Sequence, residues 1–281
     1  MASSSSPPSV NWAELPAELI SLILIRLTTV EILNNAQKVC RSWRLVCKQP
    51  SMFRKIDMRN NGTVGYFKDK MCRHAVDLSE GGLVEISMEH YGDDRLLSYI
   101  AERSSNLRRL RLAMTHPLTS KGFVNAVMKF PLLEDLEIFH GYPGFDLKTI
   151  GQSCPLLKTL KLNRPFLTSP VKYDDEALAI AETMPNLRHL ELFGNRLTNS
   201  GLNAILDNCL HLEHLDIRRC FNIHLVRDLE KRCSERIRDF KRPDDSTADS
   251  SYHVTSDTDS SEEDDDFCSD DSDDNAYYLL E

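Results

Sequence analysis

The sequence lacks the features that mark a membrane-spanning or secreted protein. No apolar run approaches the roughly twenty residues that a bilayer-spanning helix needs, and the dense run Leu22–Ile25 holds four. No basic segment followed by an apolar stretch precedes Trp12, so a secretory signal is not predicted. The eight cysteines include no Cys-x-x-Cys pair, which argues against a disulfide framework and a structural zinc site. We therefore expect a cytoplasmic or nuclear protein with reduced thiols, and neither a metal, a cofactor nor a membrane partner.

Catalytic motifs are missing as well. The sequence contains no Gly-x-Ser-x-Gly, no glycine-rich phosphate loop and no His-Glu-x-x-His. Its nine histidines are scattered along the chain. We therefore expect a protein that is not itself an enzyme.

Acidic and basic residues are unevenly distributed along the chain. The formal net charge is −9, from 34 Lys and Arg against 43 Asp and Glu. Residues 244–281 hold 15 of these acids and no base, so residues 1–243 carry 28 acids against 34 bases, a net charge of +6. The Ser/Pro-rich start and the Ser/Asp/Glu-rich end hold too little apolar surface to offset their ordering entropy. We predict that residues 1–11 are disordered and that 241–281 form a disordered acidic tail.

The middle of the chain is repetitive. Six segments match Leu-x-x-Leu-x-Leu, and their first positions are 24, 26, 24, 30 and 25 residues apart, which is the period of leucine-rich repeats. The extra residues of the fourth interval fall in a Pro- and Ser-containing loop at 164–175. The last two apolar positions of each segment alternate as on one face of a short strand. The segments are Leu83/Ile86/Met88, Leu107/Leu110/Leu112, Leu133/Leu136/Ile138, Leu157/Leu160/Leu162, Leu187/Leu190/Leu192 and Leu212/Leu215/Ile217.

Between these strands, apolar residues recur with helical spacing, as in Leu96/Leu97/Ile100 and Leu202/Ile205/Leu206. Several of these helices end at a proline, which stops the helix before the next strand. Each strand-helix unit leaves an apolar edge that only stacking can bury. The sequence therefore predicts an α/β fold, with a curved solenoid of about six recognisable units and caps over residues 59–240.

The repeats resemble the cysteine-containing subtype of leucine-rich repeat. Thr198-Asn199-Ser200-Gly201-Leu202 precedes a helix that ends at Asn208-Cys209, and Cys220 follows a strand. We predict that the four repeat cysteines are small buried hydrophobes rather than redox or metal groups. They are Cys154, Cys209, Cys220 and Cys233.

Before the repeats lies a predicted helix, Pro16–Leu27, which is apolar almost all round. A surface helix is normally apolar on one stripe only, so this helix needs a cover on more than one side. A module of some forty residues is near the size limit for a self-sufficient core. The cover comes either from the first repeat of the solenoid or from a partner.

Residues 12–58 resemble the F-box. The resemblance rests on Leu15-Pro16, the Glu18-Leu19-Ile20 and Ile23-Leu24 run, Val39-Cys40-Arg41-Ser42-Trp43, and Phe53 with Ile56-Asp57. Met52-Phe53 stands where many members have Leu-Trp. An F-box followed by such repeats is similar to the plant F-box/LRR-repeat family, whose members are substrate receptors of Skp–cullin–F-box ubiquitin ligases.

This resemblance implies a short three-helix F-box that docks on a Skp-type adaptor and through it on cullin, while the repeats hold a protein substrate and other subunits transfer ubiquitin. Ordinary three-helix core packing is the alternative for each predicted adaptor contact. These contacts are Leu15, Pro16, Leu19, Ile20, Ile23, Leu27, Val39, Cys40 and Trp43.

The outward strand positions should line the concave face of the solenoid and bind the unknown substrate. Their charges change sign from unit to unit, so no continuous basic stripe exists for nucleic acid. Phe139 and Phe193 are the predicted apolar anchors, unless they pack under an adjacent loop. The full candidate set is Arg109, Arg111, Phe139, Lys161, His189, Phe193, His214 and Arg218.

The tail supports three interpretations. Ser256, Ser260 and Ser261 each have an acid three residues on, a pattern that acidophilic kinases read. The tail could also fold back on the basic body, or simply aid solubility. Two rival functions stay open: a repeat protein whose acidic tail binds histones or other basic proteins, and an F-box scaffold outside any ligase.

Overall fold

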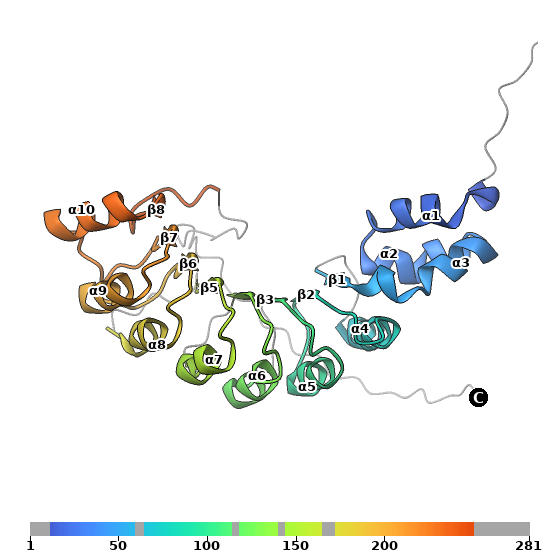
Figure 1. Cartoon of the computed structure of the whole chain (residues 1–281), viewed down its shortest axis with the longest axis horizontal. Coiled ribbons are helices and arrows are strands. Elements are labelled where there is room, and N and C mark those ends of the chain that lie inside the picture. The colour runs from blue at the N-terminus through green and yellow to red at the C-terminus, as the bar shows by residue number, and fades with distance from the viewer. Residues whose placement is uncertain (1–11, 60–64, 114–117, 140–143, 165–171, 250–281) are drawn as a thin grey trace, which may run out of the picture. The chain divides into compact units, whose positions relative to one another are not determined.

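The computed structural model describes residues 12–59, 65–113, 118–139, 144–164 and 172–249. In this part of the chain, one parallel sheet runs in sequence order from β1 to β8. The strands line the inner side of an arc, and helices α4 to α9 follow its outer side (Figure 1). This is the predicted α/β solenoid. Its strands are β1 Lys55–Met58, β2 Glu85–Glu89, β3 Arg109–Ala113, β4 Asp135–Phe139, β5 Thr159–Asn163, β6 His189–Glu191, β7 His214–Asp216 and β8 Asp239–Lys241.

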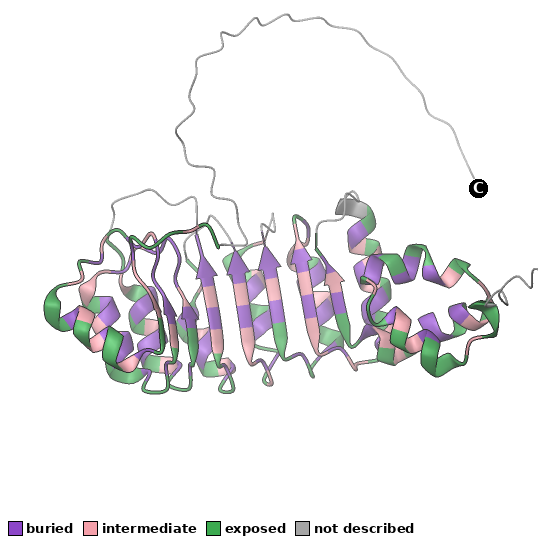
Figure 2. Ribbon diagram, turned by 90° about the horizontal axis from the view of Figure 1, so that it is seen from above, coloured by how far each residue is buried: buried purple, intermediate pink, exposed green. Residues whose placement is uncertain are grey.

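The helices between the strands carry the second apolar pattern. They are α4 Gly65–Leu78, α5 Asp94–Arg103, α6 Ser120–Val127, α7 Leu147–Ser153, α8 Asp175–Thr183, α9 Asn199–Asn208 and α10 Arg227–Arg236. Neighbouring helices pack on one another from α4 to α9. Figure 2 shows how buried residues alternate with more exposed ones along the strands.

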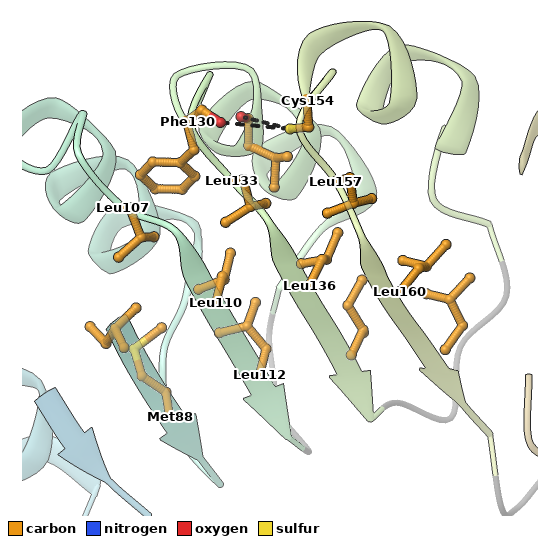
Figure 3. Close-up of a cluster of buried hydrophobic side chains, with 14 of the residues drawn as sticks. Met88, Leu107, Leu110, Leu112, Phe130, Leu133, Leu136, Cys154, Leu157 and Leu160 are labelled. Atoms are coloured by element: carbon orange, nitrogen blue, oxygen red, sulfur yellow. Dashed lines mark hydrogen bonds between the residues drawn. The ribbon is translucent and has the colours of Figure 1, made fainter. Parts of the chain in front are cut away.

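Strand pairing places equivalent leucines of successive repeats side by side. Leu110 pairs with Leu136, which pairs with Leu160, and all three are 1% exposed or less. Figure 3 shows these side chains between the sheet and the helices. Cys154 lies above them, with its Sγ 3.7 Å from the carbonyl oxygen of Phe130. Stacked leucines therefore form the continuous core that each repeat cannot form alone.

The repeat cysteines are buried, as the sequence predicts. Cys154, Cys209, Cys220 and Cys233 are each 2% exposed or less. Burial raises the pKa of the Cys154 and Cys209 thiols to about 11, so these sulfurs stay protonated near neutral pH. Cys154 and Cys209 pack at helix ends, Cys220 packs in the turn after β7, and Cys233 packs inside α10, all as small apolar groups.

In the long fourth interval between repeats, a buried ion pair joins the residue after β5 to the first turn of α8. Arg164 donates through Nη1 to Glu176 Oε2 at 2.6 Å, and both residues are 4% exposed. Asn195 donates to the same carboxylate from the next repeat. Residues 165–171 of the predicted loop lie outside the described residues. The pair fixes the start of α8 despite the longer connection.

The N-terminal module contains three short α-helices: α1 Ala17–Leu24, α2 Thr29–Asn34 and α3 Arg41–Cys47. Three 3₁₀ turns accompany them: η1 Trp12–Glu14, η2 Ala36–Lys38 and η3 Pro50–Phe53. Thr28 and Glu31 form a capping box at the start of α2. Helix α1 packs on α3 through the buried side chains Ile20, Leu24, Trp43 and Val46.

The module joins the solenoid through α2. The backbone N–H of Asp57, in β1, donates to the Thr29 hydroxyl at 3.0 Å, and Thr29 is 4% exposed. Helix α2 also packs on β1 and α4, and η3 packs on α4. The first edge of the sheet is therefore covered by the module, and the sheet begins inside the segment predicted as the F-box.

The last strand requires a correction to the predicted tail. Disorder was expected from residue 241, but Lys241 is in β8, and the Arg219 N–H donates to the Pro243 carbonyl at 2.8 Å. Asp249 accepts from Lys241 and Arg218, which lower its pKa to about 2. Residues 241–249 thus belong to the folded unit, because their turn pairs with the basic ends of the last strands. Ser256, Ser260 and Ser261 lie outside the described residues.

The contact between Thr29 and Asp57 gives a testable prediction. Thr29→Val keeps the side-chain shape but leaves the part-buried Asp57 N–H without its acceptor, which should lower the free energy of unfolding by about 1–3 kcal/mol. Urea unfolding followed by circular dichroism measures the change. Thr29→Ser retains the hydroxyl and should lose less; equal losses in both variants would contradict a role for this hydrogen bond.

Candidate functional site

The outer side of α1 presents apolar side chains that the rest of the described chain does not cover. Leu19, Leu22 and Ile25 are 47%, 57% and 61% exposed. They recur every third residue and so share one side of the helix, while Ile20 and Leu24 on the other side are fully buried. We call Leu19, Leu22 and Ile25 the apolar face. Of the two covers considered from the sequence, the described part of the solenoid does not provide one for this face.

The nine predicted adaptor contacts divide into three groups. Pro16, Leu19 and Val39 are exposed. Ile20 and Trp43 are 0% and 8% exposed, so these two predictions are corrected to core packing. Trp43 is anchored there by a hydrogen bond from its Nε1 to the Trp12 carbonyl at 3.1 Å. The half-buried remainder packs against the core: Leu15, Ile23, Leu27 and Cys40.

The sequence reasoning missed four exposed apolar residues of the module. Besides Leu22 and Ile25, Trp12 is 59% exposed and Leu45 is 71% exposed. The signal for Leu22 and Ile25 was present, because they follow Leu19 at helical spacing. A helix that is apolar all round has two apolar stripes, and only one can face α3.

Cys40 differs from the other described cysteines. It precedes α3, it is half-buried, and its Sγ lies 3.0 Å from the Ser42 hydroxyl. That hydroxyl lowers the pKa of the Cys40 thiol, whereas burial raises the pKa of Cys72 to about 12. Cys40 is therefore a natural chemical probe of the module surface.

The concave face of the sheet carries two rows of charged side chains that pair across strands. In the first row, Arg109 Nε lies 2.6 Å from an Asp135 oxygen, and Arg109 Nη1 lies 3.6 Å from Glu85. In the second row, Arg111 Nε donates to Glu137 at 2.8 Å. Lys161 Nζ lies 2.8 Å from Glu191.

The strand register explains these pairs. Arg109 stands between Glu85 and Asp135 in the sheet, and adjacent strands are about 4.8 Å apart. Signs alternate over part of each row, from Lys55 to Asp135 in the first and from Arg111 to Glu191 in the second, so these charges have neighbours of opposite sign. A shallow hollow of about 230 Å³ lies over these strands, with Ser87 and Thr159 in its lining. This surface offers polar recognition without a dominant charge.

Three predicted substrate contacts do not lie on this exposed surface. Phe139, Phe193 and Arg218 are 4%, 5% and 5% exposed, so the prediction of exposed apolar anchors is wrong. Strand β6 ends at Glu191 and β7 at Asp216, so the alternation no longer holds at residues 193 and 218. Phe139 is the last residue of β4. The Arg218 guanidinium lies over the Phe193 ring, 5.7 Å from its centroid.

The other five candidates do face the concave side. They include His189 and His214, whose rings stack with centroids 5.8 Å apart. His214 Nδ1 lies 2.8 Å from an Asp239 oxygen, and its side chain is 14% exposed. The five residues that the structure brings together here are Arg109, Arg111, Lys161, His189 and His214.

The described ranges hold neither a metal-binding cluster nor a membrane-spanning helix. No group of three or more His, Cys, Asp or Glu side chains in them could hold a metal ion. Among the same residues, no helix is long and apolar enough to cross a bilayer.

A three-helix module that caps a leucine-rich-repeat solenoid defines the class of F-box proteins with repeats, and comparison with known proteins agrees. A family model described as F-box-like matches residues 12–59. The chain belongs to the plant F-box/LRR-repeat protein family.

Its relatives include three proteins of Arabidopsis thaliana. F-box protein SKIP19 is 56% identical over 271 residues, which is 92% of this chain and 88% of the relative. F-box/LRR-repeat protein 23 is 58% identical over 242 residues, 84% of this chain but 54% of the relative. F-box protein SKIP1 is 31% identical over 265 residues, 83% of this chain and 87% of the relative. Proteins of this family are generally non-catalytic adaptors, and membership supports the general role of a substrate receptor.

The corrected position of Arg218 leads to a second prediction. Arg218→Met leaves the Asp216 carboxylate, which is 3% exposed, without its bidentate partner. The free energy of unfolding should fall by about 3–5 kcal/mol, because an uncompensated charge stays buried. Urea unfolding measures this loss. Adding Asp216→Asn should restore part of it, whereas Arg109→Met, which removes an exposed pair, should cost less than about 1 kcal/mol. A small loss for Arg218→Met would contradict this structural role for Arg218.

Proposed function

We propose that this protein is the substrate-recognition subunit of a Skp–cullin–F-box ubiquitin ligase. It docks a Skp-type adaptor through the N-terminal module, and through that adaptor cullin, and it holds a protein substrate on the repeats. Ubiquitin transfer is carried out by other subunits. The protein acts in the cytoplasm or the nucleus.

The uncovered apolar face of α1 carries this proposal. Burying a large aliphatic side chain that is otherwise exposed contributes roughly 1.5–3 kcal/mol. Leu19, Leu22 and Ile25 together therefore offer several kcal/mol for docking before the entropic cost of association is subtracted. Val39 and the half-buried Leu15 and Ile23 extend the apolar surface of the module.

The join between the module and the sheet separates the two binding tasks. Helix α2 and η3 contact the solenoid, while α1 directs its apolar face away from its own core. An adaptor on α1 and a substrate on the concave face therefore use different surfaces. The buried join sets the position of one partner relative to the other, which favours transfer to a fixed region of the substrate.

Substrate recognition is assigned to the concave residues whose charges are paired across strands. Arg109, Arg111 and Lys161 each have a carboxylate neighbour. A substrate must exchange these pairs for its own polar groups, which yields specificity more than affinity. These residues define the substrate by class: it presents a protein surface of mixed charge.

The third prediction concerns the apolar face. Leu22→Asp/Ile25→Asp should weaken adaptor binding at least about 100-fold, because two apolar contacts are lost and two charges are desolvated. Isothermal titration of the full chain with a purified Skp-type adaptor measures the affinity. Leu210→Asp is the matched control, since Leu210 lies on the repeats and is 68% exposed.

The double variant Leu22→Asp/Ile25→Asp and the control Leu210→Asp should both melt like the wild type, because the changed side chains are exposed. Unchanged adaptor affinity in the double variant, with an intact wild-type complex, would remove α1 from the interface. If the wild type forms no complex at all, the receptor function itself is rejected.

The fourth prediction uses Cys40 as a reporter. Adaptor binding should slow alkylation of Cys40 by iodoacetamide several-fold, because the partner covers the half-buried thiol. Peptide mass spectrometry after a timed pulse identifies the labelled cysteine. Cys154 and Cys209 should remain unlabelled with or without the adaptor, since they are buried and protonated. Equal labelling of Cys40 in both states would place the adaptor elsewhere.

A further inference from the structure

Helix α3 bears an exposed basic stripe that the receptor function leaves unexplained. Arg41, Arg44, Leu45 and Lys48 follow one another at spacings of three, one and three residues, so they share one side of the helix. All four are exposed, whereas Trp43, Val46 and Cys47 on the opposite side are buried. We call Arg41, Arg44, Leu45 and Lys48 the basic stripe.

The surrounding sequence contains no acid that could neutralise the stripe locally. Residues 32–56 include six Lys and Arg and no Asp or Glu. Within the described ranges, Arg41, Arg44 and Lys48 form no ion pair, and Arg44 only donates to the Gln37 carbonyl at 3.1 Å. This contrasts with the concave face, where Arg109 and Arg111 each have a carboxylate partner on the neighbouring strand.

The arrangement is unfavourable for the isolated module. Like charges four residues apart, such as Arg44 and Lys48, destabilise a helix. Arg41 is the first residue of α3, where the positive end of the helix dipole disfavours a cation. A partner that supplies negative charge would relieve both repulsions.

From these contacts and charges we propose that the basic stripe binds an acidic segment of the Skp-type adaptor, with Leu45 as its apolar anchor. This inference rests on the proposed function and adds a second, electrostatic contact to the apolar face. Leu45, 71% exposed in the middle of the stripe, favours a protein over a nucleic-acid backbone, since phosphates gain nothing from an aliphatic side chain. Charged rims raise association rates by steering the encounter, and salt screens this effect.

The test measures association kinetics of the full chain with a purified Skp-type adaptor by stopped flow. The charge-reversal variant is Arg41→Glu/Lys48→Glu, which alters no hydrogen bond of the described residues. The matched control, Arg95→Glu/Lys121→Glu, makes the same change in net charge at exposed bases of α5 and α6. Thermal melting confirms that both variants fold.

At about 50 mM salt, the stripe variant should associate at least about tenfold more slowly than the wild type and the control. At about 500 mM salt, the Debye length is only a few ångströms and the charges are screened. The difference in association rate should then fall below about twofold. Leu45→Ala should speed dissociation and leave the salt dependence unchanged.

Other outcomes overturn the inference in distinguishable ways. Rates that agree within twofold at low salt show that the stripe does not contact the adaptor. A faster variant shows that the acidic residues beyond 249 occupy the stripe in the free protein. Binding of random-sequence duplex DNA to the wild type but not to the variant, with loss of adaptor association, makes the stripe a nucleic-acid site. If neither the wild type nor the control associates, the proposed function fails first.

Discussion

Parallel pairing of each strand with its equivalent in the next repeat is the constraint on which the rest of the structure depends. Leu110 pairs with Leu136, and Leu136 pairs with Leu160. Each strand position therefore has the equivalent position of the next repeat about 4.8 Å away. Inward positions then form a continuous leucine core, and outward positions form rows. Arg109 meets Asp135 and Arg111 meets Glu137 for the same reason. The same strand register therefore sets both the leucine core and the charged rows of the concave face.

A sheet built this way has two edge strands, and the module covers the edge of the first, β1. At the first edge, Thr29 of α2 accepts the Asp57 N–H, and the module becomes a cap. At the other end, the parallel pairing continues beyond β7 and β8, with the Arg219 N–H donating to the Pro243 carbonyl, and Asp249 accepts from Arg218. Covering an edge protects it from pairing with other chains. Because α2 provides this cover, α1 has its remaining face free, and the binding surface follows from the way the edge is closed.

The repeats could be predicted from the sequence because their signal is periodic and local. Six leucine motifs and their spacing define the sheet, and the turn cysteines are buried as expected. Strands β1 and β8 were missed because Ile56 and Phe240 lack the full motif and are recruited by their neighbours. Phe139 and Phe193 were misplaced because strand alternation cannot reveal where a strand ends. In the module, Ile20 and Leu22 have the same character in sequence. Only the packing of α1 on α3 decides that Ile20 is core and Leu22 is surface.

Charged side chains are arranged in opposite ways on the concave face of the sheet and on helix α3. On the concave face, cations already have carboxylate partners, so a substrate must replace existing pairs and gains little from long-range attraction. On α3, Arg41 and Lys48 are exposed and form no ion pair with a described residue, so their field extends into solvent. Exposed pairs contribute little stability, but unpaired like charges attract a complementary partner from a distance. Under the proposed function, this difference places long-range attraction in the module, which meets the adaptor, and selectivity in the repeats, where a substrate with mismatched charges is disfavoured.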